Sequence, residues 1–191
     1  MTVKLQSRDR DLIAVLDSHV KALSFEQVGR GWWGRTEDPK GSVSRRLRTL
    51  ASGGHLSVFE AAAGPELDLA APILEVEAGQ NLSGFDDLQR TASERSRLPA
   101  SKRRFVSTSG GKATVLADGS PDLATHELNF GAMYLRLRGD VEGWRLVPSL
   151  FDSRMTAALD ADGVRYEVLC HPISCDLDRL KAACGAGLQV W

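Results

Sequence analysis

The sequence predicts an α+β protein in which an N-terminal winged helix-turn-helix precedes a small α/β domain. Three stretches with helical apolar spacing lie within residues 8–52, and two alternating, strand-like stretches follow them. A second series of helical and strand-like stretches begins at residue 120. The expected domains are the winged helix-turn-helix over residues 1–80, a connector over 81–119 that packs on it, and the α/β domain over 120–191.

The first two helices are expected over residues 8–23 and 24–33. Ser7 and Ser24 stand where these helices would begin, and serine is a favoured N-cap because its hydroxyl accepts a free backbone N–H. Asp9 would lie in the first turn, where a negative charge is favoured by the helix dipole. Both helix starts are thus marked by local chemistry.

The third helix is expected over residues 42–52 and would end at the glycine pair 53–54, as helices commonly do. Trp32 of the second helix is expected to pack beneath it. Apolar residues recur on its inner face: Val43, Leu47 and Leu50. Its outer face would present hydroxyl and basic side chains: Ser42, Ser44, Arg45, Arg46 and Arg48.

Two strand-like stretches follow, over residues 55–62 and 72–79. We expect them to pair as a hairpin. Three helices followed by a two-stranded hairpin is the order of a winged helix-turn-helix, so the third helix would be the recognition helix and the hairpin the wing.

The C-terminal stretch predicts a mixed α/β order. Ser120 and Pro121 mark the start of a helix that continues to about Arg138, because serine is a good N-cap and proline is favoured at the first helical position. The stretches after it read as three strands, a helix and a short final strand: 143–151, 153–160, 163–171, 176–185 and 188–191.

The charge of the chain is unevenly distributed. The formal net charge is -1, yet residues 1–112 hold 17 basic and 14 acidic side chains, whereas residues 113–191 hold 7 and 11. Six basic residues lie between Arg30 and Arg48, opposed there only by Glu37 and Asp38. The near-neutral total therefore does not argue against a nucleic-acid partner.

A basic third helix predicts double-stranded DNA as the partner. Major-groove binding needs cations near phosphates and side chains that reach base edges, and arginine is the commonest reader of guanine. Base or phosphate contacts are expected from the outer face of the third helix: Ser42, Ser44, Arg45, Arg46 and Arg48. Backbone contacts are expected just before it, from Arg30, Arg35 and Lys40. A solvated helix face without a ligand remains the alternative for this run of charge.

Three stretches resemble the bacterial replication-relaxation family, winged-helix proteins of plasmids and other mobile elements. They are RDRDLIAVL with SFEQV and SRRLRTLASGGHLS, then RRFVSTSGGKATVL, and ATHELNFGAMYLRL. His126, Leu128 and Asn129 match a helix motif of that family, although Asn129 lies nearer to His126 than in the family pattern. The resemblance implies DNA binding and a regulatory role in transcription or replication of a mobile element. We expect a homodimer, because most such modules pair two half-sites.

The C-terminal order also resembles a degenerate restriction-endonuclease-like core. Asp152 and Glu167 stand where that fold carries Mg²⁺-binding carboxylates, with Glu127 as a third candidate. Leu169 occupies the place of the lysine in the Glu-x-Lys motif, so we expect a structural or dimerisation unit and no enzyme. A metal-dependent nuclease, or a protein-interaction module built on the winged helix or the C-terminal domain, remains the alternative.

No cofactor or metal is expected. The sequence CHPISC places Cys170, His171 and Cys175 close together, with Cys184 further on, but the spacing is wide for a chelating pair and small buried thiols are the simpler interpretation. The N-terminus lacks the apolar core of a signal peptide, and no apolar run is long enough to span a membrane. These features, with an odd number of cysteines, predict a cytoplasmic protein without a membrane partner.

Overall fold

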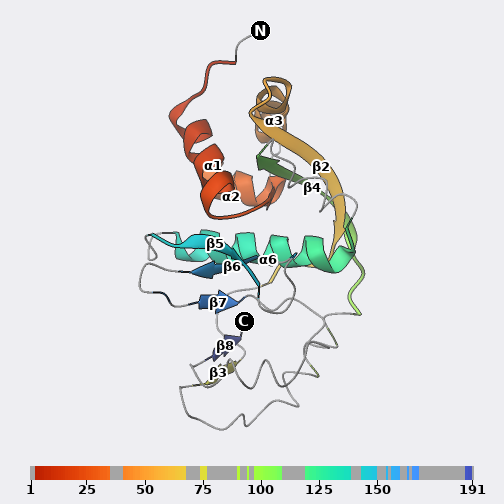
Figure 1. The fold of residues 1–191 in the computed structure, drawn as a ribbon. Coiled ribbons are helices and arrows are strands. Elements are labelled where there is room, and N and C mark those ends of the chain that lie inside the picture. The colour runs from red at the N-terminus through yellow and green to blue at the C-terminus, as the bar shows by residue number, and fades with distance from the viewer. Residues whose placement is uncertain are drawn as a thin grey trace.

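The computed structural model describes residues 3–34, 41–67, 74–76, 90, 94, 97–108, 119–138, 143–149, 154, 156–159, 163, 165–167 and 188–190. Within these ranges the protein is mixed α+β, with four helices and three small antiparallel sheets, which confirms the expected class. Helices α1, α2 and α3 lie above α6 in Figure 1, whereas strands β6 and β7 lie below it. None of the helices in the described part of the chain is long and apolar enough to cross a membrane.

Helix α1 (Ser7–Ser18) is shorter than expected and begins one position earlier. Its N-cap is Gln6 rather than Ser7, because the carboxylate of Asp9 accepts the backbone N–H of Gln6 in a capping box. The helix ends before residue 23 because Leu23 and Ser24 form strand β1 instead. Asp9 therefore serves as a capping side chain as well as an acid near the helix dipole.

Helices α2 (Phe25–Trp33) and α3 (Ser42–Ser52) confirm the predicted second and third helices. Ser24 caps α2: its Oγ accepts the N–H of Gln27 at 3.1 Å, and the Gln27 side chain accepts the N–H of Ser24 at 2.9 Å. The predicted inner residues of α3 are all fully buried: Val43, Leu47 and Leu50. The apolar spacing in the sequence thus predicts the position and the buried face of α3 correctly.

The predicted hairpin is wrong in its second strand. Strand β2 (Leu56–Ala63) pairs antiparallel with β4 (Ser101–Thr108), from Leu56 opposite Thr108 to Ala63 opposite Ser101. Strand β1 pairs with the other edge of β4, so the sheet order is β1-β4-β2. Within 72–79, strand β3 (Leu74–Val76) pairs instead with β8 (Leu188–Val190). The expected connector 81–119 therefore contributes the central strand of the N-terminal sheet.

The pairing with β4 is favoured because β4 supplies apolar side chains to both faces of the sheet. On one face Val106, with Leu56 of β2, joins the core formed by α1, α2 and α3. On the other face Phe105 stacks on Phe59 at a centroid distance of 5.7 Å and joins a second core. The second core is completed by residues of β2 and α6: Ala61, Ala63, Leu123, Ala124 and Leu128.

Helix α6 (Pro121–Leu137) confirms the helix predicted after Ser120, with Ser120 at the N-cap and proline at the first position. It packs on the N-terminal sheet and also contacts the C-terminal strands. Its polar residues fasten the chain that leaves β2: Thr125 accepts the N–H of Gly64 at 2.7 Å, and Asn129 accepts that of Leu67 at 3.0 Å. The helix therefore covers the face of the sheet opposite to α3.

The three predicted C-terminal strands are present as β5 (Arg145–Pro148), β6 (Thr156–Leu159) and β7 (Arg165–Glu167). They form an antiparallel sheet in the order β5-β6-β7. The helix predicted over 176–185, Asp152 and the three cysteines lie outside the described residues. The expected domain limits, the homodimer and the likeness to an endonuclease core stay predictions.

Candidate nucleic-acid interface

The outer face of α3 presents exposed basic side chains. Arg45, Arg48 and Thr49 are exposed, because they lie opposite the buried residues of the same helix. Ser42 and Ser44 are half-buried at its first turns. The helix starts at Gly41, whose φ of 64° suits glycine, and the N–H of Arg45 bonds the Gly41 carbonyl at 2.8 Å. Arg45 is thus held in the first turn.

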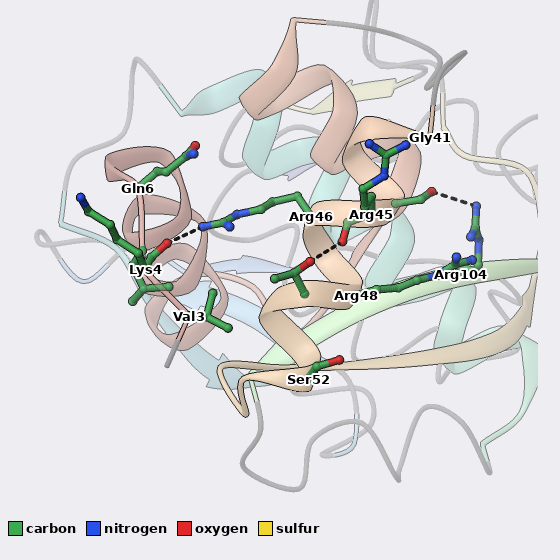
Figure 2. A pocket seen from close by; sticks show the side chains of 12 residues that line it. Val3, Lys4, Gln6, Gly41, Arg45, Arg46, Arg48, Ser52 and Arg104 are labelled. Atoms are coloured by element: carbon green, nitrogen blue, oxygen red, sulfur yellow. Dashed lines mark hydrogen bonds between the residues drawn. The ribbon is translucent and has the colours of Figure 1, made fainter. Parts of the chain in front are cut away.

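An open groove of about 1400 Å³ runs over this face of α3 (Figure 2). The segment before α1 lines one side and Arg104 of β4 the other, with α3 between them. The lining holds twelve residues, five of them basic: Val3, Lys4, Leu5, Gln6, Gly41, Ser44, Arg45, Arg46, Arg48, Thr49, Ser52 and Arg104. Since none of the twelve is an aspartate or glutamate, the groove is a site of positive potential.

Arg45 and Arg48 have no carboxylate partner among the residues that the structure describes. Both side chains project from α3 into the groove (Figure 2). Their planar guanidinium groups carry several N–H donors, which match the paired oxygens of phosphate and the O6 and N7 of guanine. Of the predicted site residues on α3, these two arginines are exposed and have no carboxylate partner in the described part of the chain.

Arg104 was not among the predicted site residues, yet the fold brings it to the groove. Its guanidinium lies 4.5 Å above the ring of Phe25 and donates to Ser44 Oγ at 3.3 Å. Exposed Glu60 stands opposite it in the strand register. Stacking and the Ser44 bond therefore position Arg104 beside α3 while leaving other N–H donors of its fork for a ligand.

Arg46, predicted as an outer-face DNA contact, has partners within the protein. It turns toward α1, where it forms an ion pair with Asp9 and donates to the Lys4 carbonyl at 2.8 Å. Burial raises the pKa of Asp9. The hydrogen bonds from Arg46 and Gln6, together with the charges of Arg46 and Arg8, lower this pKa by more than burial raises it. The net pKa of Asp9 lies below its usual value, and the pKa of Arg46 is raised in turn. Arg46 is thus an ion-paired residue of the groove lining.

Arg30 is also paired internally. Its guanidinium forms an ion pair with Glu66, which additionally accepts from Gln27 Nε2 at 3.2 Å. Arg30 is absent from the lining of the groove, so its predicted contact to the DNA backbone finds no support in the geometry. Arg35 and Lys40, predicted to make similar contacts, lie outside the described ranges.

Lys4, Thr49 and Arg104 line the groove but were missed from the sequence. The basic run 102–104 was a usable signal, because alternation in a strand places residues 102 and 104 on one face and 103 on the other. Thr49 follows Arg45 by four positions on the same helix face. Lys4 has no such signal, since it precedes α1 and follows no periodic pattern.

Two further predictions concern residues outside the groove, Glu127 as a metal-binding carboxylate and Trp32 as a residue packed beneath α3. Glu127 is buried, accepts from Thr156 Oγ1 at 2.7 Å and lies 3.7 Å from Lys21 Nζ, so it is a core residue. No group of three potential ligands that could hold a metal ion occurs in the described part of the chain. The indole N–H of Trp32 bonds Asp11 on α1 at 2.6 Å, so its polar contact is to α1 rather than to α3.

Comparison of the chain with protein-family models, curated proteins and solved structures finds no match. The resemblance to the replication-relaxation family therefore stays a prediction based on the quoted stretches.

Proposed function

We propose that this protein is a sequence-specific double-stranded DNA-binding regulator and that α3 enters the major groove. One observation carries the proposal: Arg45 and Arg48 project from α3 into a groove that no acidic side chain lines. An α-helix fits the major groove of B-form DNA, and arginine can bond both base edges and phosphates. The basic face of α3 therefore has the shape and the charge that a duplex requires.

The order of elements supports a winged helix-turn-helix. Three helices precede the antiparallel pair β2–β4, and β1, between the first two helices, joins the same sheet. The wing would then be built on β2 and β4 rather than on the predicted hairpin of residues 55–62 and 72–79. In this arrangement α3 is the recognition helix.

The position of each arginine suggests its role. Recognition helices contact base edges with their N-terminal residues, so Arg45 in the first turn is the candidate base reader. Arg48, one turn further on, and Arg104 at the side of the groove are the candidate phosphate contacts. Through its resemblance to the replication-relaxation family, the protein would regulate transcription or replication of a mobile element as a homodimer.

Selection of bound sequences from random duplex DNA tests this function. The expected result is an enriched motif, and a symmetric motif would support paired half-sites. The variant Arg45→Ala/Arg48→Ala should lose the motif and most of the salt-dependent affinity.

The matched control is Arg10→Ala/Arg136→Ala. It removes the same charge from exposed positions outside the groove and should bind like the original chain. If the α3 variant bound the selected duplex as tightly as this control at the same salt, the site assignment would be wrong. If the unmodified chain bound no duplex at low salt, the function would be wrong.

A further inference from the structure

The chain that precedes α1 lies along α3. We call residues 3–6 the arm. All four residues line the groove, although they belong to no helix or strand. At its first residue the arm touches the end of α3: a Cβ added to Gly53 would lie 2.7 Å from Val3 Cγ2. The arm is therefore one side of the basic groove.

Arg46 holds the arm at two points. Its Nη2 donates to the Lys4 carbonyl at 2.8 Å, and its guanidinium pairs with Asp9, whose carboxylate accepts the Gln6 N–H at 2.7 Å. Val3 and Leu5 add partly buried apolar contacts with the core. The backbone of the arm is thus attached to α3 while the side chain of Lys4 remains exposed.

Cations consequently stand on both sides of α3. Lys4 lies on one side and Arg104 on the other, with Arg45 and Arg48 between them (Figure 2). A helix in the major groove of B-form DNA has a sugar–phosphate strand on each side, because the groove is about 12 Å wide and a helix with side chains about 10–12 Å in diameter. With α3 in the groove, each flanking cation would face one of these two strands.

We propose that the arm is a second DNA-contacting segment, in which Lys4 binds a backbone phosphate on the side of α3 opposite to Arg104 and Arg46 positions it. This inference rests on the proposed function. It specifies the ligand as B-form duplex DNA, since a single strand offers only one backbone and the major groove of an RNA duplex is too narrow for a helix. Lys4 would contribute affinity without sequence preference, because a phosphate contact carries no base information.

The test measures affinity of the full chain for a mixed-sequence DNA duplex between about 50 and 200 mM salt. A plot of log affinity against log salt has a negative slope. The expected result for Lys4→Ala is that this slope becomes shallower by about 0.9, the value for one phosphate contact. The conservative variant Lys4→Arg should have the same slope as the original chain. The control Arg10→Ala should have this slope too, since Arg10 is exposed outside the groove. The motif selected from random DNA should be the same in all of these variants.

The positioning role of Arg46 is tested by Arg46→Lys, which keeps the charge but loses the fork that joins Lys4 to Asp9. In this background Lys4→Ala should change the slope much less, whereas two independent residues would give additive effects. Thermal melting identifies any variant that fails to fold. If Arg46→Lys does not fold, Lys4→Ala alone still tests the arm contact, because it removes only an exposed side chain.

The outcomes separate the two proposals. If the unmodified chain bound no duplex, the proposed function would fail and the arm contact with it. If the chain bound duplex through Arg45 and Arg48 but Lys4→Ala kept the full slope, only the arm contact would be overturned. Equal binding of the single strand and the duplex, with the same Lys4 dependence, would also contradict it.

Discussion

Arg46 of α3 pairs with Asp9 of α1, whose carboxylate is fully buried. The same guanidinium donates to the Lys4 carbonyl, and the same carboxylate caps α1 through Gln6. One ion pair thus joins the proposed recognition helix, the first helix and the arm. Its partners meet across 37 positions of sequence, so the pair helps to determine how α3 is presented to a ligand.

Loss of the arginine should destabilise the fold. We expect Arg46→Met to lower the free energy of unfolding by about 2–3 kcal/mol, because it leaves a buried carboxylate without its counter-ion. The loss should fall below that of a fully enclosed pair, since 20% of the Arg46 side chain is exposed. Denaturant unfolding measures the change. Arg45→Met, on the exposed side of the same helix, should change it by about 0.5 kcal/mol or less, and an equal loss in both variants would contradict the structural role.

Acid should weaken the fold through Asp9. The pKa of Asp9 is lowered in the folded state, so the pair adds stability that is fully present above the unfolded value of 3.8 and is lost as the pH falls below it through the lower folded pKa. Unfolding free energies measured from neutral pH to below pH 3.8 should therefore fall less steeply for Asp9→Asn than for the original chain. Asp17→Asn, an exposed control on the same helix, should retain the original slope.

The buried phenol of Tyr134 should make the fold less stable at high pH. Burial raises the pKa of Tyr134; Arg138 lowers it and Asp11 raises it, with a net increase above 10.0. The neutral phenol therefore adds stability that is fully present below the unfolded pKa and is lost as the pH rises through the folded pKa. Tyr134→Phe should show a smaller loss of stability above pH 10.0 in thermal melts, and an unchanged pH profile would contradict the burial effect.

Gly131 should resist replacement, whereas Gly31 should accept alanine. A Cβ on Gly131 of α6 would lie 2.8 Å from Leu23 Cδ2 and 3.0 Å from Gln27 Oε1, and Gln27 is fixed by its own hydrogen bonds. We expect Gly131→Ala to cost about 1–3 kcal/mol by overpacking.

For Gly31 the added Cβ would meet only Leu135 Cδ2 at 2.8 Å, the end of a partly exposed side chain that can rotate. Gly31→Ala should be neutral or stabilising by up to about 1 kcal/mol through helix propensity. The same unfolding measurement compares the two variants. The reverse order would contradict the close packing of α6 on α2.

Local chemistry made several elements predictable. The boundaries of α3, the caps of α2 and α6 and the approximate places of β5, β6 and β7 follow from short patterns: a serine at a helix start, glycine at its end and apolar residues at regular spacing. Each pattern concerns residues within a few positions of one another. The exposed orientation of Arg45 and Arg48 followed from the same helical spacing.

Strand pairing was not local and was predicted wrongly. The stretch 72–79 alternates and lies nearer to β2, but β2 pairs with β4, which carries Phe105 and Val106 for the two cores. Which of several alternating stretches pairs with β2 depends on what covers each face of the sheet. That includes α6, which is far away in sequence.

The sequence by itself determined that a basic helix over residues 42–52 turns its apolar side inward, because that depends on periodicity alone. Only the tertiary structure decided which of its arginines remain available. Arg46 lies between two exposed arginines in the sequence, yet α1 brings it the Asp9 carboxylate, and a charge at the edge of a core pairs with the nearest opposite charge. The folded chain likewise brought Lys4 and Arg104 to the two sides of α3, and the place of both beside this helix depends on contacts between segments far apart in the sequence.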